Sequence, residues 1–216
     1  MGNISLVTIV LIVANGLISY KGFQDHSFFE KYKFFVGRIK NGEKIRLFSS
    51  GFLHVDMQHL LFNMFSLYIF APVVIGYLGQ SSFVLVYVIS LLVGSFLSYS
   101  FHKEDNYYTA VGASGAVMGI IYSAILLRPE MSLYLFFIPI PIPAYVFGIG
   151  YLLYSIYGMK AKNDNIGHDA HFGGAIGGYV LTLILLPGLI TTNLLMVVLL
   201  ALPIVILFLL KKTGRI

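Results

Sequence analysis

The sequence contains no cysteine and few charged residues. Without cysteine the chain can form no disulfide, no thiolate nucleophile and no cysteine-ligated metal site, so any chemistry must come from serine, histidine, carboxylates or a bound ion. Only 11% of the 216 residues are charged, whereas an ordinary soluble domain has roughly 25%. Because 58% of the residues are hydrophobic, most of the chain cannot face water. We therefore predict a membrane protein with no separate soluble domain.

Apolar runs of the length that crosses a bilayer recur along the whole chain. A helix needs about 20 apolar residues to cross the hydrocarbon core. The first run lacks the positive start and the small-residue cleavage site of a signal peptide, so we interpret it as a membrane helix. Alternating Ile and Pro at 138–143 excludes helix there and predicts a connection. The predicted helices are 4–20, 57–78, 83–101, 111–127, 143–159, 168–186 and 194–210.

A basic stretch separates the first two predicted helices. Residues 21–53 hold seven of the fourteen Lys and Arg residues, interleaved with aromatic residues, which favours an interfacial, partly amphipathic loop. The net charge of +5 lies mainly in segments beside apolar runs, so we expect contact with membrane lipids and no nucleic-acid partner. We expect one polytopic domain over 1–216.

Polar side chains at membrane depth are functional candidates because burying them in lipid is costly. His59 and Asn63 are spaced i, i+4 and share one helix face. They could converge on a ligand, or simply join helices by hydrogen bonds. His54 is five residues earlier, about 140° round a continuous helix, so we expect it to make a structural hydrogen bond instead.

Two further helices carry a serine and a histidine among glycines. One begins Gly112-Ala113-Ser114-Gly115, and the other has His171, Gly174 and Gly178 on one stripe. Small residues let helices approach closely, and a Ser–His hydrogen bond of about 2.6 to 3.2 Å needs such an approach. The pattern indicates a nucleophile and its base.

The other ionisable residues fit this chemistry less well. Asp169 is two residues from His171 and faces away on a helix, so we expect a dyad and no triad. His168 lies at i−3 from His171, but no carboxylate shares their face, so we expect no metal. We expect His26 and His102 to lie in solvated loops.

Three motifs resemble those of the rhomboid intramembrane serine proteases. The segment from Arg46 to Met64 is similar to that family's first-loop arginine followed by its His, His, Asn pattern, with His54, His59 and Asn63 at the matching places. Gly112-Ala113-Ser114-Gly115 resembles the nucleophile motif, although Ala116 stands where a last Gly would be counted. Ala170-His171-Phe172-Gly173-Gly174 resembles the element that presents the base.

The resemblance implies an all-α, six-transmembrane-helix rhomboid-like bundle, with a core at about 46–187 and a seventh C-terminal helix at about 194–210. It implies a serine endopeptidase without a cofactor, acting on transmembrane protein substrates in a water-filled cavity. Ser114 would attack the scissile bond with His171 as base, through an acyl-enzyme intermediate. His59, Asn63 and the Ser114 backbone N–H would bind the oxyanion. His54, Gly112, Gly115, Gly174 and Gly178 would support the site.

Two other hypotheses of function stay open from the sequence. A non-enzymatic relative could bind membrane clients on the same scaffold, although such proteins typically lack the Ser or the His. A transporter or channel would need ionisable residues spread along a path, and here they cluster at one depth. We expect a multi-pass protein of the cell membrane. Thirteen of the fourteen Lys and Arg residues lie on the same side of the membrane as the predicted site, and the positive-inside rule places that side in the cytoplasm. In bacterial members of the family, however, the site opens to the outside of the cell. We expect the site of this protein to open to the outside as well.

Overall fold

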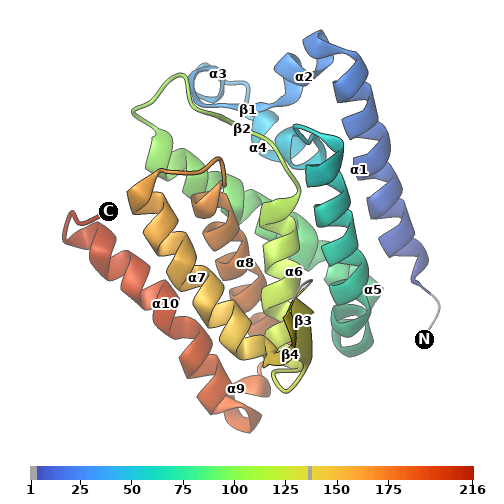
Figure 1. Cartoon of the computed structure of the whole chain (residues 1–216), viewed down its shortest axis with the longest axis vertical. Helices are drawn as coiled ribbons and strands as arrows, with labels where there is room; N and C mark the ends of the chain where they lie inside the picture. The colour runs from blue at the N-terminus through green and yellow to red at the C-terminus, as the bar shows by residue number, and fades with distance from the viewer. Residues whose placement is uncertain (1–3, 136–137) are drawn as a thin grey trace.

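Helices dominate the computed structural model, which describes residues 4–135 and 138–216 (Figure 1). The helices are α1 Leu6–Gln24, α2 His26–Tyr32, α3 Val36–Lys40, α4 Arg46–Ser49, the 3-10 helix η1 Ser50–Phe52, α5 Met57–His102, α6 Ser114–Leu127, α7 Ala144–Ala161, α8 His168–Leu185, α9 Leu189–Thr192 and α10 Leu194–Lys212. Two short antiparallel ladders pair β1 Phe34–Phe35 with β2 Thr109–Ala110, and β3 Ser132–Leu135 with β4 Ile138–Pro143.

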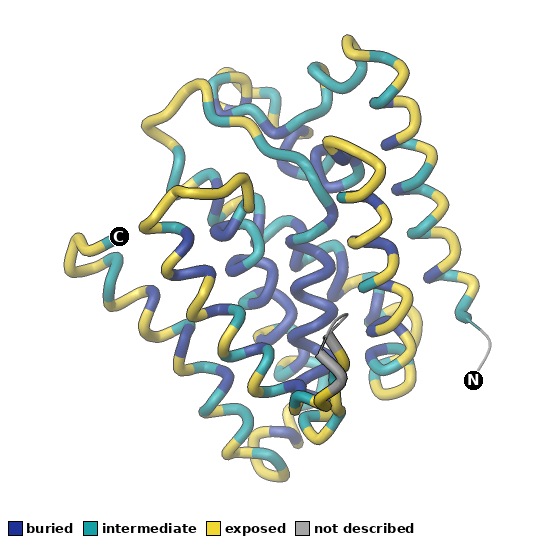
Figure 2. Tube along the Cα trace, in the orientation of Figure 1, coloured by how far each residue is buried: buried dark blue, intermediate teal, exposed yellow. Residues whose placement is uncertain are grey.

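Helix α6 forms the centre of the bundle. Every residue from Gly115 to Leu127 is buried, and Figure 2 shows the tube of α6 dark blue along its length. The two halves of α5 and α8 make the most extensive contacts with it. The start of α6 therefore lies among α5, η1 and α8, where a side chain can meet groups from several elements.

Helix α5 contains two of the predicted helices. The sequence predicts separate helices at 57–78 and 83–101, and the structure joins them at Gly79, whose φ of 80° and ψ of 168° break the helix. Glycine adopts this backbone conformation without the steric cost of a side chain. The two halves run in different directions (Figure 1), so the break at Gly79 takes the place of the gap at 79–82 between the two predicted helices.

The outer helices of the bundle expose apolar side chains. By length and composition α1, α5 and α10 could each cross a membrane, and α6 is apolar but shorter. Leu6, Leu17, Leu195 and Leu209 are more than half exposed on α1 and α10, which suits contact with lipid. The structure supports the predicted all-α membrane protein.

Short helices replace much of the predicted loop at 21–53. Arg46, only 4% exposed, organises this segment: its Nη1 donates to the carbonyl oxygens of Glu30 and Lys33, each at 2.9 Å, and its Nε donates to Glu43 at 2.7 Å. One guanidinium satisfies three acceptors because its N–H groups form a rigid fork. The ladder of β1 with β2 joins this segment to the chain that leads into α6.

The Ile-Pro stretch at 138–143 is not helical, as predicted. It forms β4, which pairs with β3 in the register Ser132↔Pro143 and Leu133↔Ile142. The sequence indicated only a connection, so the strand was missed.

Candidate active site

The chain turns sharply just before α6. The sequence predicts a helix from 111, but Gly112 takes a φ of +135° and the helix begins at Ser114. A Cβ on Gly112 would lie 2.8 Å from Cε1 and 2.9 Å from Nε2 of His59. Glycine is therefore required both by the backbone angle and by the imidazole packed against it. The turn leaves Ser114 at the first position of α6, beside His59.

The hydroxyl of Ser114 lies 2.5 Å from Nε2 of His171. Both residues are half-buried. The structure thus brings together two side chains that lie 57 positions apart in the sequence. The two atoms are therefore within hydrogen-bonding distance.

Glycines allow this close approach of α6 to α8. A Cβ on Gly174 would collide with the backbone of Gly115, lying 2.6 Å from its carbonyl carbon, and a Cβ on Gly178 would lie 2.6 Å from the carbonyl carbon of Gly119. The second half of α5 also lies close to α8, because a Cβ on Gly94 would lie 2.6 Å from the Ala170 carbonyl oxygen. Any side chain at these positions would push the helices apart.

The other ring nitrogen of His171 contacts a residue that the sequence analysis missed. Tyr151 in α7 places its Oη 2.6 Å from His171 Nδ1, and the two rings are roughly parallel, with centroids 6.1 Å apart. Helix α7 also contains Tyr145, Tyr154 and Tyr157. No spacing in the sequence separates Tyr151 from these three.

His54 holds the turn before α6 in place. Ser19 Oγ donates to the Phe52 carbonyl and lies 2.8 Å from His54 Nδ1, so it accepts the Nδ1 proton. His54 Nε2 then accepts the Ala113 N–H at 3.4 Å. Burial first, and then the neighbouring His59, lower the pKa of His54 to about 3, which keeps the ring neutral, as these bonds require.

The predicted angle between His54 and His59 was wrong. Helix α5 begins at Met57, so His54 lies outside it, and the two rings are in edge contact with centroids 4.9 Å apart. An angle of about 140° would apply only if one continuous helix joined His54 to His59. The hydrogen-bonding part of the expectation agrees with the structure.

His59 and Asn63 lie on the first two turns of α5. The carboxylate of Asp56 caps the helix by accepting the His59 N–H at 2.7 Å. Asn63 is 6% exposed, and its Nδ2 donates to the His59 carbonyl at 3.2 Å. An amide nitrogen carries two N–H groups, so this bond uses only one of them.

The remaining candidates lie apart from Ser114. His168 is 3% exposed and its Nε2 is 3.1 Å from Asp164. His102 is not the solvated residue we expected, because its ring stacks on Tyr108 at 3.5 Å and its Nε2 lies 3.2 Å from the buried Asp169. Within 4–135 and 138–216 no group of three or more His, Asp or Glu residues could hold a metal ion.

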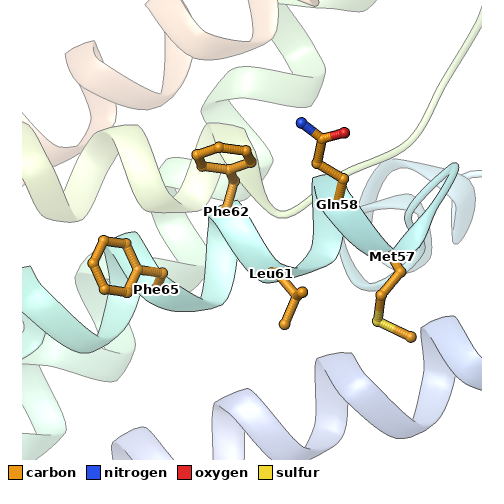
Figure 3. Close-up of a pocket in the computed structure, with 5 residues that line it drawn as sticks. All are labelled: Met57, Gln58, Leu61, Phe62 and Phe65. Atoms are coloured by element: carbon orange, nitrogen blue, oxygen red, sulfur yellow. The ribbon is translucent and has the colours of Figure 1, made fainter. Parts of the chain in front are cut away.

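An apolar groove of about 570 Å³ lies on another face of α5. Met57, Gln58, Leu61, Phe62 and Phe65 line it, and Figure 3 shows Met57 and Leu61 projecting on the side of α1. None of the predicted site residues lines this groove. The candidate site is the contact between Ser114 and His171, with His59 packed over Gly112 and Tyr151 on the other nitrogen of the His171 ring. Asn63 lies one turn further along α5 from His59.

Comparison with known proteins shows that this chain is similar to rhomboid proteins. The family description "Rhomboid domain" matches residues 41–188. The chain is 28% identical over 186 residues to "RHOMBOID-like protein 12, mitochondrial" of Arabidopsis thaliana, covering 78% of this chain and 55% of that protein. It is 35% identical over 147 residues to "Putative rhomboid protease YdcA" of Bacillus subtilis, covering 67% of this chain and 68% of that protein.

A mammalian relative is matched over a smaller part of its length. The chain is 32% identical over 135 residues to "Presenilin-associated rhomboid-like protein, mitochondrial" of Rattus norvegicus, covering 60% of this chain and 35% of that protein. The chain thus spans about half the length of the Arabidopsis relative and about a third of the rat relative.

Proposed function

Because this chain belongs to the rhomboid family, we propose that it is an intramembrane serine endopeptidase in which Ser114 and His171 form the catalytic dyad. The observation that carries the proposal is the 2.5 Å distance between Ser114 Oγ and His171 Nε2. A nucleophile and its base need this contact for the base to take the hydroxyl proton. The substrates we propose are transmembrane proteins, and the site needs no cofactor.

The proposed reaction follows the general course of serine hydrolysis. As Ser114 Oγ attacks the scissile carbonyl carbon, its proton moves to His171 Nε2. The C–N bond breaks when that proton passes to the leaving amine, which leaves an acyl group on Ser114. Water then attacks the ester, with His171 again as base, and releases the acid and the free hydroxyl. We propose that a water-filled cavity supplies this water.

The proposed donors to an oxyanion come from the start of α6 and the first two turns of α5. Ser114 is the first residue of α6, and the first N–H groups of a helix have no partner within the helix. The Ser114 N–H can therefore donate to the oxyanion, together with the imidazole of His59 over Gly112 and the second amide N–H of Asn63. Each such donor contributes roughly 3 to 4 kcal/mol in tested cases.

We also propose the finer architecture of the chain. The rhomboid core would cover about 46–187 within one polytopic domain, with six membrane-spanning helices that include the two halves of α5. Helix α10 would be the additional seventh span, at about 194–210. We propose the cell membrane as its location. The names of several relatives point instead to mitochondria, and fractionation of the host cell distinguishes the two.

The experiment uses the purified full chain in detergent with a single-pass transmembrane substrate. We expect cleavage by the natural protein and none by Ser114→Ala or His171→Ala, with the thermal unfolding of both variants unchanged. Cleavage retained by Ser114→Ala contradicts the mechanism. Binding of the substrate without cleavage by the natural protein would favour the non-enzymatic, client-binding alternative.

A further inference from the structure

His171 makes a hydrogen bond at each of its two ring nitrogens. Nε2 faces Ser114 Oγ at 2.5 Å, and Nδ1 faces Tyr151 Oη at 2.6 Å. The second contact comes from α7, a helix that contributes no residue to the proposed dyad or oxyanion site. A tyrosine hydroxyl can either donate or accept, so the role of Tyr151 depends on which nitrogen of His171 carries the proton.

Contacts on both sides of Tyr151 fix α7 in position. Tyr122 of the central helix donates its hydroxyl proton to the Gly148 carbonyl at 2.9 Å. Further along α7, the imidazole of His168 packs so tightly against Gly158 that a Cβ there would lie 2.6 Å from its Cε1. Tyr151 lies between these two anchor points. Its phenol is therefore held beside His171 by the fold and does not depend on a mobile loop.

The nearby carboxylates are engaged elsewhere. In a Ser-His-Asp triad, a carboxylate accepts the Nδ1 proton and so leaves Nε2 free to act as base. Asp169 pairs with His102, and Asp164 pairs with His168. Tyr151 Oη is thus the acceptor that the structure offers to His171 Nδ1.

We propose that Tyr151 is a positioning residue that holds His171 in the tautomer with the proton on Nδ1, and so keeps Nε2 ready to accept the proton of Ser114. This inference rests on the proposed function. Tyr151 takes the place of a triad carboxylate but is neutral, so its hydrogen bond is weaker than a charged one. A neutral bond of this kind changes a rate by about 3- to 10-fold.

The kinetic test compares two tyrosines of the same helix. Tyr151→Phe keeps the ring and removes the hydroxyl. Tyr154→Phe is the matched control, since Tyr154 is 44% exposed and its hydroxyl donates to Asp164 at 3.0 Å. We expect kcat to fall about 3- to 10-fold in Tyr151→Phe, with KM and the unfolding temperature unchanged, and no fall in Tyr154→Phe. The proposal is overturned if Tyr151→Phe and Tyr154→Phe have equal kcat, or if the lower kcat of Tyr151→Phe is explained by unfolding of that variant.

A spectroscopic test does not depend on proteolysis. In ¹⁵N-histidine-labelled protein in lipid vesicles, the signals of the ring nitrogens report the tautomer, and the His171 signal is the one lost in His171→Gln. We expect a protonated Nδ1 in the natural protein and a mixture of tautomers in Tyr151→Phe, with no change in Tyr154→Phe. A proton on Nε2 in the natural protein, or no change in Tyr151→Phe, overturns the proposal. If the natural protein cleaves nothing, the proposed function fails while this measurement still decides the role of Tyr151.

Discussion

Replacing Gly174 with alanine tests whether glycine packing sets the distance between Ser114 and His171. The new Cβ would lie 2.6 Å from the Gly115 carbonyl carbon, whereas ordinary van der Waals contact begins near 3.4 Å. Relieving the contact with the carbonyl carbon alone separates α6 and α8 by about 0.8 Å, and the Gly115 carbonyl oxygen, which would lie closer still to the new Cβ, requires more. If the shift is transmitted to the dyad, the 2.5 Å contact lengthens to at least about 3.3 Å, beyond the usual limit of about 3.2 Å for a catalytic hydrogen bond.

The expected loss of activity is larger than the loss of stability. Displacing a catalytic group by about 1 Å can lower a rate by roughly 100-fold, while overpacking of a core costs about 1 to 3 kcal/mol. We expect kcat on a transmembrane substrate to fall by about 100-fold, with folded protein still present by thermal unfolding in detergent. Gly76→Ala is the control, because a Cβ there meets nothing within 4 Å. Full activity in folded Gly174→Ala would refute the packing argument.

Two further predictions concern the groups around Ser114. Asn63→Ala should lower kcat by about 100-fold without abolishing cleavage, because one oxyanion donor among several is lost; a rate equal to that of the natural protein would exclude Asn63 from the oxyanion site. His54→Gln should change how stability depends on pH. The folded-state pKa of His54, about 3, is below the ordinary histidine value of 6.5, so the contribution of His54 to stability is present above pH 6.5 and is lost as the pH falls towards 3. Between pH 8 and pH 5 the natural protein should lose about 2 kcal/mol through this group, and His54→Gln should lose that much less. Equal losses in both proteins would contradict the buried, neutral state of His54.

The sequence predicted the parts of the site that depend on residue type and spacing. Ser114 and His171 stand among small residues, which let helices pack closely. The close approach of α6 to α8 could therefore be predicted from the sequence. The position of His59 beside Ser114 could be expected only in outline, because the turn at Gly112 depends on a backbone angle that the sequence does not specify.

Other features depend on tertiary contacts that leave no local pattern. Tyr151 is one of four tyrosines in α7, and only the anchoring of that helix against Tyr122 and His168 selects it. The sequence around His102 indicates a solvated loop, yet the His102 ring stacks on Tyr108 and its Nε2 lies beside Asp169. His54 was assigned an angle on a continuous helix, but α5 begins at Met57 as predicted, and contacts with Ser19 and Ala113 hold His54 outside it. In each case a long-range contact overrides what neighbouring residues indicate.

The central claim is that Ser114 is a nucleophile activated by His171. A fluorophosphonate probe, which phosphonylates an activated serine hydroxyl with loss of fluoride, tests this directly when the labelled residue is identified by mass spectrometry of the full chain in detergent. We predict one adduct, on Ser114, that forms in the natural protein and is absent in His171→Ala. An unlabelled Ser114, or labelling that proceeds equally fast in His171→Ala, would contradict the account.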